Sequence, residues 1–317
     1  MNKKIIFIFK IILAFVLLGI LIQKIEPNNL QNAFANSRPG YIFLALLLVV
    51  PNVGAQFIKW RFMLRLIKPD VSHFEVASSL LAGFALGFVT PGRIGEFGRA
   101  LFIQNCSRTQ VVGLALIDKM ASMCLIFLMG AVGLFFLLGI QLNSTHFYLW
   151  LGLALVAVVL VFLLAWFPEK LRKSLKKLQN VFPSRKKVSL LVSSLDNFNR
   201  KQAIQMLGLA FVFYAIITTQ YVLLLQAFEP IAYLIGYLVV GCIFITKSLL
   251  PISLGDLGIR ETAAVFFIGL IGGQEATAFN ASILIFGINL VLPSLIGFLL
   301  LLTPKLNEQL VNLKMRW

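Results

Sequence analysis

The fold depends on a segment that occurs twice in the chain, first as Pro91-Gly92-Arg93-Ile94-Gly95-Glu96-Phe97-Gly98 and again, 160 positions later, as Pro251-Ile252-Ser253-Leu254-Gly255-Asp256-Leu257-Gly258. Both copies lie inside long apolar stretches, yet both contain helix breakers and charges. A bilayer core cannot hydrogen-bond free backbone groups, so broken helices occur at that depth only where protein or a polar cavity surrounds them. The repeated segment therefore marks a candidate site.

The composition indicates an all-α integral membrane protein. Of the 317 residues 59% are hydrophobic and only 13% are charged, which is too apolar for an ordinary water-soluble domain. The net charge of +16 would suit nucleic acid only on a water-exposed domain, and the sequence leaves no such domain. We interpret the basic excess as cytoplasmic loop charge that can also hold anionic headgroups.

The cysteines and histidines predict neither a metal site nor a disulfide framework. Cys106, Cys124 and Cys242 lie in or beside apolar runs without metal-ligand spacing, and only His73 and His146 could join them. We therefore expect no metal, no other cofactor and no catalytic constellation built on these residues.

Six apolar runs are long enough to cross a bilayer, which takes about 20 residues. They lie at residues 4–23, 41–58, 111–138, 147–167, 203–226 and 279–302. The first lacks a small-residue cleavage site, so we expect a retained span rather than a signal peptide. Two further apolar regions, 76–103 and 231–271, contain the repeated segment, and Pro91 and Pro251 break them. Each of these two regions predicts a helix, a turn and a second helix, which gives about eight hydrophobic segments in all.

Loop charge predicts the topology. The segment 168–201 holds ten Lys and Arg residues, so we expect a cytoplasmic loop there. The other basic loops and both termini can be cytoplasmic as well only if each broken region returns to the face of the membrane from which it entered. That arrangement places 20 basic residues inside and leaves Lys24 and Arg38 outside. It allows two re-entrant hairpins or two pairs of short spans, and hairpins are favoured because 76–90 holds only 15 residues.

The two hairpins would then enter from opposite faces, the first from inside and the second from outside. Flanking spans repeat with similar offsets, which predicts one repeat at 41–138 with hairpin 76–103 and a second at 203–302 with hairpin 231–271. Inverted repeats of this kind place a substrate site near the midplane, at the interface of the repeats.

Ten charged residues remain inside the apolar regions after the loops are assigned, and one of them, Lys10, is close enough to the inner interface to reach it. The other nine lie deeper. They are the bases Arg93, Arg99, Lys119, Lys247 and Arg260 and the acids Glu96, Asp118, Asp256 and Glu261. A charge at mid-bilayer costs about 2.5 to 3.5 kcal/mol on insertion scales, so partners or water must accompany these groups.

We predict that the turns bind an anion. Backbone N–H groups at Gly92, Gly95, Gly255 and Gly258 and the guanidinium groups of Arg93, Arg99 and Arg260 would contact phosphate. The alternative is that local pairs simply lock the hairpins: Glu96 with Arg99, Asp118 with Lys119, and Asp256 with Arg260. Lys247 is either a contact for the ligand or a partner of Glu261 or Asp118.

These motifs resemble the flippase-like family, also described as the lysylphosphatidylglycerol synthase transmembrane region. The resemblance rests on Lys59-Trp60-Arg61, on Pro91 to Glu96 with Arg99, on Asp118-Lys119, and on Leu250 to Gly255 continuing to Arg260-Glu261. It covers nearly the whole chain. At Asp118-Lys119 this sequence departs from the family, in which Glu-Arg is common.

The resemblance implies an inner-membrane protein that moves, or in some members modifies, lipid-anchored substrates. In multidomain members a soluble domain carries the aminoacyl transfer, whereas this sequence reaches Trp317 soon after its last apolar run. We therefore expect translocation of an anionic or polyprenyl-phosphate-linked lipid rather than enzymatic synthesis.

Two alternatives remain. Pro251-Ile252-Ser253 is similar to a loop of undecaprenyl-diphosphate phosphatases, which would make the chain an enzyme acting on a lipid phosphate or diphosphate. Ser253 has no accompanying histidine there, however. The other alternative is a non-catalytic membrane partner that holds a glycosyltransferase through the basic segment 168–201.

Overall fold

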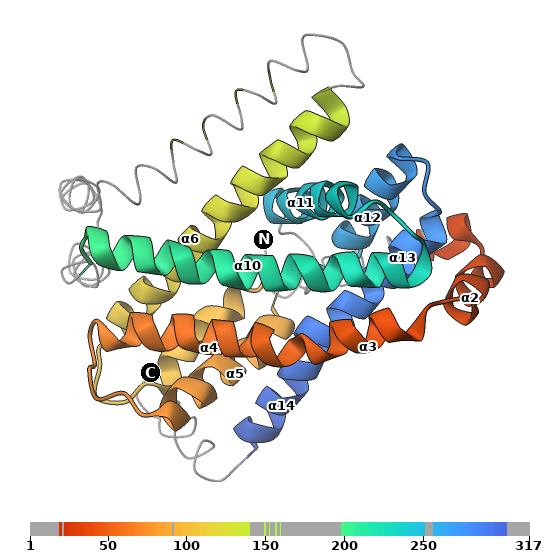
Figure 1. Ribbon diagram of the computed structural model, residues 1–317. Helices are drawn as coiled ribbons and strands as arrows, with labels where there is room; N and C mark the ends of the chain where they lie inside the picture. The colour runs from red at the N-terminus through yellow and green to blue at the C-terminus, as the bar shows by residue number, and fades with distance from the viewer. Residues whose placement is uncertain are drawn as a thin grey trace, which may run out of the picture.

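The computed structural model is a bundle of helices, and it describes residues 19–20, 22–90, 92–139, 149, 152, 156, 159, 198–250 and 256–302. No strand occurs among these residues. The elements in chain order are α2 (Pro27–Ala35), α3 (Pro39–Leu47), α4 (Val49–Arg65), α5 (His73–Phe88), the 3-10 helix η1 (Ile94–Phe102), α6 (Arg108–Leu134), the π-helical turn η2 (Phe135–Gly139), α10 (Arg200–Phe228), α11 (Tyr233–Leu249), α12 (Ile259–Leu270), α13 (Glu275–Phe286), the π-helical turn η4 (Gly287–Val291) and α14 (Leu292–Leu301). Figure 1 shows their arrangement.

Within the described part of the chain, four continuous helical stretches are long and apolar enough to cross a membrane: Pro39–Arg65, Arg108–Leu137, Arg200–Phe228 and Glu275–Leu301. Each has 27 to 30 residues and so extends for about 40 Å, more than the roughly 30 Å of a hydrocarbon core. They confirm long apolar helices at four of the six predicted spans, 41–58, 111–138, 203–226 and 279–302. The predicted spans at 4–23 and 147–167 and the basic segment up to residue 197 lie almost wholly outside the described residues.

Both broken regions contain two helices separated by a turn, as predicted. The first consists of α5 and η1, and the second of α11 and α12. With 16 and 17 residues, α5 and α11 are about 25 Å long, shorter than the hydrocarbon core. In the first turn Gly92 and Arg93 have φ of 60° and 56°. The Thr90 hydroxyl accepts a hydrogen bond from the Gly95 N–H at 2.7 Å, which fastens the turn.

Helices α3 and α4 run antiparallel to α10. The Arg38 N–H donates to the Ala227 carbonyl at 2.7 Å, and the Asn52 amide donates to Gln220 at 2.8 Å. Further along, the Lys59 ammonium lies 4.8 Å from the centre of the Phe213 ring. Partner numbers fall as residue numbers rise, so the end of α4 and the start of α10 share one end of the bundle (Figure 1).

The two broken regions open at opposite ends of this bundle. Glu75, near the start of α5, accepts a hydrogen bond from the Gln104 N–H just beyond η1, at 2.6 Å. Glu229, at the end of α10, accepts one from the Gln274 N–H just beyond α12, at 2.9 Å. Helix α5 follows α4, so the first broken region begins and ends at the end of the bundle where α4 ends. Helix α11 follows α10, so the second begins and ends at the opposite end, where α10 ends.

The first helix of each broken region packs against a long helix from the other half of the chain. Helix α5 contacts α14 and α11 contacts α6. A Cβ at Gly297 would overlap the carbonyl oxygen of Leu81, and one at Gly133 would lie 2.5 Å from that of Leu238. Such close backbone approach is typical of helix pairs in membranes. Each half of the chain thus supplies a long helical stretch that packs against the broken region of the other half.

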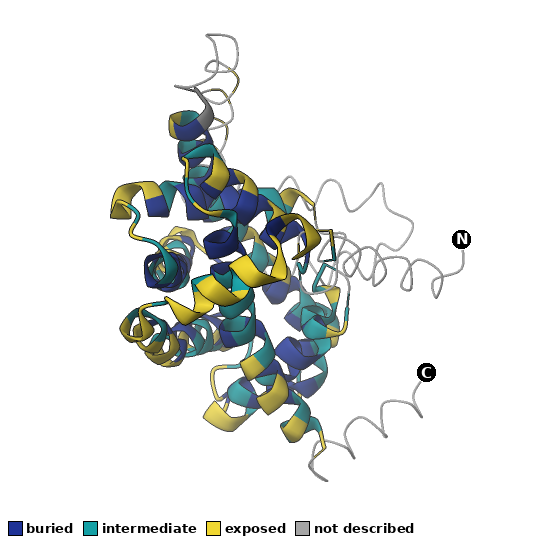
Figure 2. Ribbon diagram, turned by 90° about the vertical axis from the view of Figure 1, so that its right-hand side faces the viewer, coloured by how far each residue is buried: buried dark blue, intermediate teal, exposed yellow. Residues whose placement is uncertain are grey.

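The outer surface of the bundle is apolar. Large hydrophobic side chains such as Phe43, Val50, Leu234, Phe266 and Leu299 are more than half exposed. In Figure 2 exposed residues lie along the outward sides of the helices and buried ones face the interior. An apolar outer surface around an interior that contains charges is the pattern of a helical protein in lipid.

Because a methyl group at Gly297 has no space, we expect Gly297→Ala to destabilise the bundle by about 1–3 kcal/mol, the usual cost of overpacking. Gly208 on α10 is the matched control, since a Cβ there meets no atom within 4 Å, and Gly208→Ala should be neutral or slightly stabilising. Thermal unfolding of the purified variants in detergent measures the difference. Equal midpoints would contradict the close α5–α14 contact.

Candidate functional site

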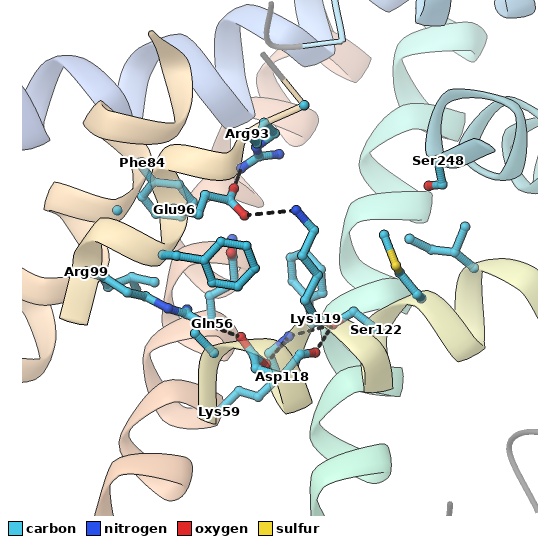
Figure 3. Close-up of a pocket in the computed structure, with 18 of the residues that line it drawn as sticks. Gln56, Lys59, Phe84, Arg93, Glu96, Arg99, Asp118, Lys119, Ser122 and Ser248 are labelled. Atoms are coloured by element: carbon cyan, nitrogen blue, oxygen red, sulfur yellow. Dashed lines mark hydrogen bonds and ion pairs between the residues drawn. The ribbon is translucent and has the colours of Figure 1, made fainter. Parts of the chain in front are cut away.

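A cavity of about 190 Å³ lies inside the bundle, where the turns of the two broken regions meet. Its polar lining comes from α4, η1 and α6, from the end of α11 and from both turns (Figure 3). The charged and polar residues that line it are Gln56, Lys59, Arg93, Glu96, Arg99, Asp118, Lys119, Ser122, Lys247, Ser248 and Asp256. Apolar side chains, among them Phe84, Phe97 and Phe213, complete the wall.

Asp118 on α6 is shared by two cations from different elements, and we name these three residues the Asp118 group. Its carboxylate lies 3.0 Å from the Lys59 ammonium of α4 and 3.0 Å from the Arg99 guanidinium of η1. The exposed fractions are 7% for Asp118, 4% for Lys59 and 9% for Arg99. Lys59 also donates to the Ser122 hydroxyl at 2.8 Å. The group ties α4, η1 and α6 together in the interior.

Arg99 is held in position by an aromatic ring as well as by its carboxylate. Its guanidinium carbon lies 3.7 Å from the ring centre of Trp60, a fully buried residue, and such stacking favours arginine over lysine. The Trp60 indole donates to the Ser79 hydroxyl at 3.1 Å, and that hydroxyl donates to the Arg99 carbonyl at 2.8 Å. Side chain and backbone of Arg99 are therefore both fixed.

Glu96 is also shared by two cations, and we name Arg93, Glu96 and Lys119 the Glu96 group. Arg93, in the left-handed region at φ 56°, pairs with Glu96 one turn later. The Lys119 ammonium approaches the same carboxylate only to 3.9 Å, which is too long for a hydrogen bond. Lys119 follows Asp118 on α6, so the two groups are adjacent on the cavity wall (Figure 3).

The second turn contributes one balanced pair. Lys247, in the last turn of α11, lies 3.5 Å from Asp256 and 5.0 Å from the ring centre of Phe244. Asp256 has φ of 64°, a conformation that Asp adopts more readily than most residues. We refer to Lys247 and Asp256 as the Asp256 pair.

Arg260 and Glu261 form a closed network away from the cavity lining. Arg260 pairs with Glu261 and donates to the Ser282 hydroxyl of α13 at 3.0 Å, and that hydroxyl donates to Glu261 at 3.0 Å. The other Glu261 oxygen accepts from the Gly258 N–H at 2.7 Å. Glu261 is completely buried. This network caps α12 and joins it to α13.

The local pairs considered from sequence spacing are wrong. Glu96 pairs with Arg93 and Lys119 instead of Arg99, Asp118 pairs with Arg99 and Lys59 instead of its neighbour, and Asp256 pairs with Lys247 instead of Arg260. Adjacent residues on a helix, such as Asp118 and Lys119, point to different sides. The fold instead brings charges from other elements within reach of each carboxylate. Lys59, expected in a cytoplasmic loop, is buried because α4 continues to Arg65.

The structure brings four of the eight predicted anion-binding residues together at the cavity. Gly92, Arg93, Arg99 and Lys247 line the cavity with the acids Glu96, Asp118 and Asp256 and with Lys119. Gly95, Gly258 and Arg260 do not belong to its lining, and Pro91, Pro251 and Gly255 lie outside the described residues. The binding role of these residues stays a prediction.

Sequence reasoning missed Lys59, Gln56, Ser122 and Ser248 in the lining. Gln56 and Lys59 lie three positions apart at the end of an apolar run, on one face of a helix. That spacing, together with the Lys59-Trp60-Arg61 motif of the family resemblance, was the available signal. The two serines carried no signal in the sequence, because Ser is common in membrane helices as an interhelical contact.

The cavity is suited to an anion. Five cationic and three anionic side chains line it, a formal excess of two positive charges. The Nε atoms of Arg93 and Arg99 are buried and have no hydrogen-bond partner among the described residues, and an unsatisfied buried donor is costly. A ligand that accepts hydrogen bonds and carries negative charge would relieve both conditions.

Long apolar helices, a lipid-compatible surface and an interior cavity lined by charges define a multi-pass helical membrane protein. The chain belongs to the family described as the lysylphosphatidylglycerol synthase TM region, which matches residues 7–297. This membership confirms the resemblance drawn from the motifs and indicates a lipid-related function in a membrane. No curated protein matches the chain.

The Asp118 group predicts a large cost for removing its carboxylate. Asp118→Asn would leave two buried cations facing each other, and breaking a buried ion pair costs about 3–5 kcal/mol. Adding Lys59→Met should recover part of this loss, because one uncompensated charge disappears. Thermal midpoints of the single and double variants in detergent measure the effect, and a double variant less stable than Asp118→Asn would contradict the shared pairing.

Proposed function

We propose that this protein binds the headgroup of an anionic lipid, or of a polyprenyl-phosphate-linked one, and facilitates its movement between leaflets. The observation that carries the proposal is the cationic cavity at the meeting point of the two turns. Five cations lie there against three acids, and charges are retained at such depth chiefly for function. The family supports a lipid as the ligand.

The proposed topology has six spans and two re-entrant hairpins, 76–103 and 231–271, in the plasma (inner) membrane with both termini cytoplasmic. Short α5 and α11, openings at opposite ends of the bundle, and reciprocal packing between the halves all support it. The two turns would then approach the midplane from opposite faces, which is where transporters built from inverted repeats bind their substrates.

Cysteine labelling tests this topology. In a variant without Cys106, Cys124 and Cys242, a cysteine at exposed Gln104 marks the opening of the first hairpin and one at exposed Gln274 marks the second. We expect a membrane-impermeant maleimide to label residue 104 only from the cytoplasmic face and residue 274 only from the outer face. Labelling of both from one face would contradict the opposed hairpins.

Binding would require the headgroup to compete with the acids of the cavity. Glu96 is the acid most open to competition, because it is about one quarter exposed and holds Lys119 only at 3.9 Å. An anion that takes over Lys119 and Arg93 would free Glu96 and loosen the first turn from α6. The Asp118 group, buried and stacked on Trp60, would stay fixed as the wall against which the turn moves.

Transport in reconstituted vesicles tests the function. Arg93→Gln and Lys119→Gln should each slow movement of a fluorescent anionic lipid about tenfold or more, since one charge-assisted hydrogen bond is worth roughly that much. Lys201→Gln, which removes an exposed charge at the start of α10, is the control and should transport normally. The readout is dithionite quenching of outer-leaflet fluorescence.

Unchanged transport in both cavity variants would remove the cavity from the mechanism. Release of phosphate from a polyprenyl diphosphate by the purified protein would favour the membrane-embedded phosphatase instead. Loss of transport only when a copurifying glycosyltransferase is absent would favour the role of a partner subunit.

A further inference from the structure

The charge around the cavity is divided unevenly among its three clusters. The Asp118 group has two cations for one carboxylate, and so has the Glu96 group, whereas the Asp256 pair is balanced. Each of the two groups therefore carries one positive charge in excess. The second turn contributes none.

Neighbouring residues do not change this balance. The undescribed part of the second turn is Pro251-Ile252-Ser253-Leu254-Gly255, which contains no ionisable side chain. Arg260, behind the turn, is balanced by Glu261. The described site thus has a formal excess of two positive charges.

Each group also offers a donor that its own carboxylate does not use. In the Asp118 group it is the buried Nε of Arg99, and in the Glu96 group it is the buried Nε of Arg93. The Lys119 ammonium is a further donor, since 3.9 Å to Glu96 exceeds hydrogen-bonding distance. An anion placed between the groups would have an uncompensated positive charge on either side, and the partly exposed side chains of Arg93 and Lys119 are open to it.

The size of the cavity limits the ligand. At about 30 Å³ for each water in the liquid, its volume of about 190 Å³ corresponds to about six waters. That is enough for the five heavy atoms of a phosphate group. It is below the roughly 300–1,000 Å³ of clefts for larger ligands, so the cavity matches a small anionic group better than a large one.

We propose that the ligand of this cavity is a phosphomonoester dianion, with one phosphate oxygen towards the Arg99 side and another towards Arg93 and Lys119. The inference rests on the proposed function, because it names the headgroup for the same site. A phosphomonoester carries nearly two negative charges above its second pKa of about 6 and would neutralise both groups. A phosphodiester carries one charge and would leave one group unbalanced.

Lipid binding at pH 8 tests the inference. Native mass spectrometry of the purified full chain in detergent measures binding of phosphatidate, a phosphomonoester, against phosphatidylglycerol, a phosphodiester, and phosphatidylcholine. We expect phosphatidate to bind roughly tenfold to a hundredfold more tightly than phosphatidylglycerol, the range of one further charge-assisted hydrogen bond. Equal binding of the two anionic lipids would overturn the phosphomonoester inference and leave the proposed function standing.

A specificity change in a variant separates this inference from general attraction of anions. Lys119→Gln removes one of the two excess charges, so the preference for phosphatidate should fall to near equality. Lys119→Arg should restore it, and Lys201→Gln should keep the ratio of the unmodified protein. A ratio unchanged in Lys119→Gln would overturn the inference, and thermal melting of each variant verifies that it is folded.

Two further outcomes test separately whether the bound phosphate belongs to a lipid or to a soluble molecule, and whether the proposed function holds at all. Glycerol 3-phosphate added without lipid should bind far more weakly than phosphatidate. If it binds equally well and with the same dependence on Lys119, the phosphomonoester chemistry is supported and carriage of a lipid is contradicted. If neither anionic lipid binds above phosphatidylcholine, both this inference and the proposed function fail.

Discussion

The rest of the site depends on the shared carboxylate of Asp118. A single buried anion joins Lys59 of α4 and Arg99 of η1 to α6, so three elements far apart in the chain meet at one atom group. Without it, two cations in a water-poor interior would repel each other and would have to reach solvent. The contact places η1, and with it the first turn, against α6. Arg93, Glu96 and Lys119 then lie close enough to form the second group.

The opposed broken helices explain why a cavity exists there at all. A helix of 16 or 17 residues is shorter than the hydrocarbon core is thick, and under the proposed topology its last carbonyl groups and the turn that follows need an interior environment. Helices α5 and α11 enter from opposite ends, and α14 and α6 from the other half of the chain pack closely against them. Their turns therefore meet in the interior, where irregular backbone is tolerated beside a polar space.

The sequence predicted the general plan well because apolar length and helix breakers are local signals. The four described spans and both helix–turn–helix regions were predictable from composition and proline positions. The ion pairs were not, because a side chain's partner depends on which helices pack together. Lys59 illustrates this. The distribution of basic residues predicted that it lies in a cytoplasmic loop, whereas in the structure α4 continues past it and its ammonium is buried against Asp118 of α6. Spacing of three or four residues suggested local pairs, whereas tertiary contacts supplied most of the actual ones.

The same fold contains two ways of burying charge, and the contrast between them supports a binding role for one. Arg260, Glu261 and Ser282 satisfy one another and the end of α12, with one cation for one anion and no place in the cavity lining. The Asp118 and Glu96 groups have two cations for each anion, arginine donors that find no acceptor in the described part of the chain, and a cavity between them. A network that served only to hold helices together would gain from the balanced arrangement, since each uncompensated charge in lipid is costly. The unbalanced groups therefore fit a site that is completed by an anion from outside the chain.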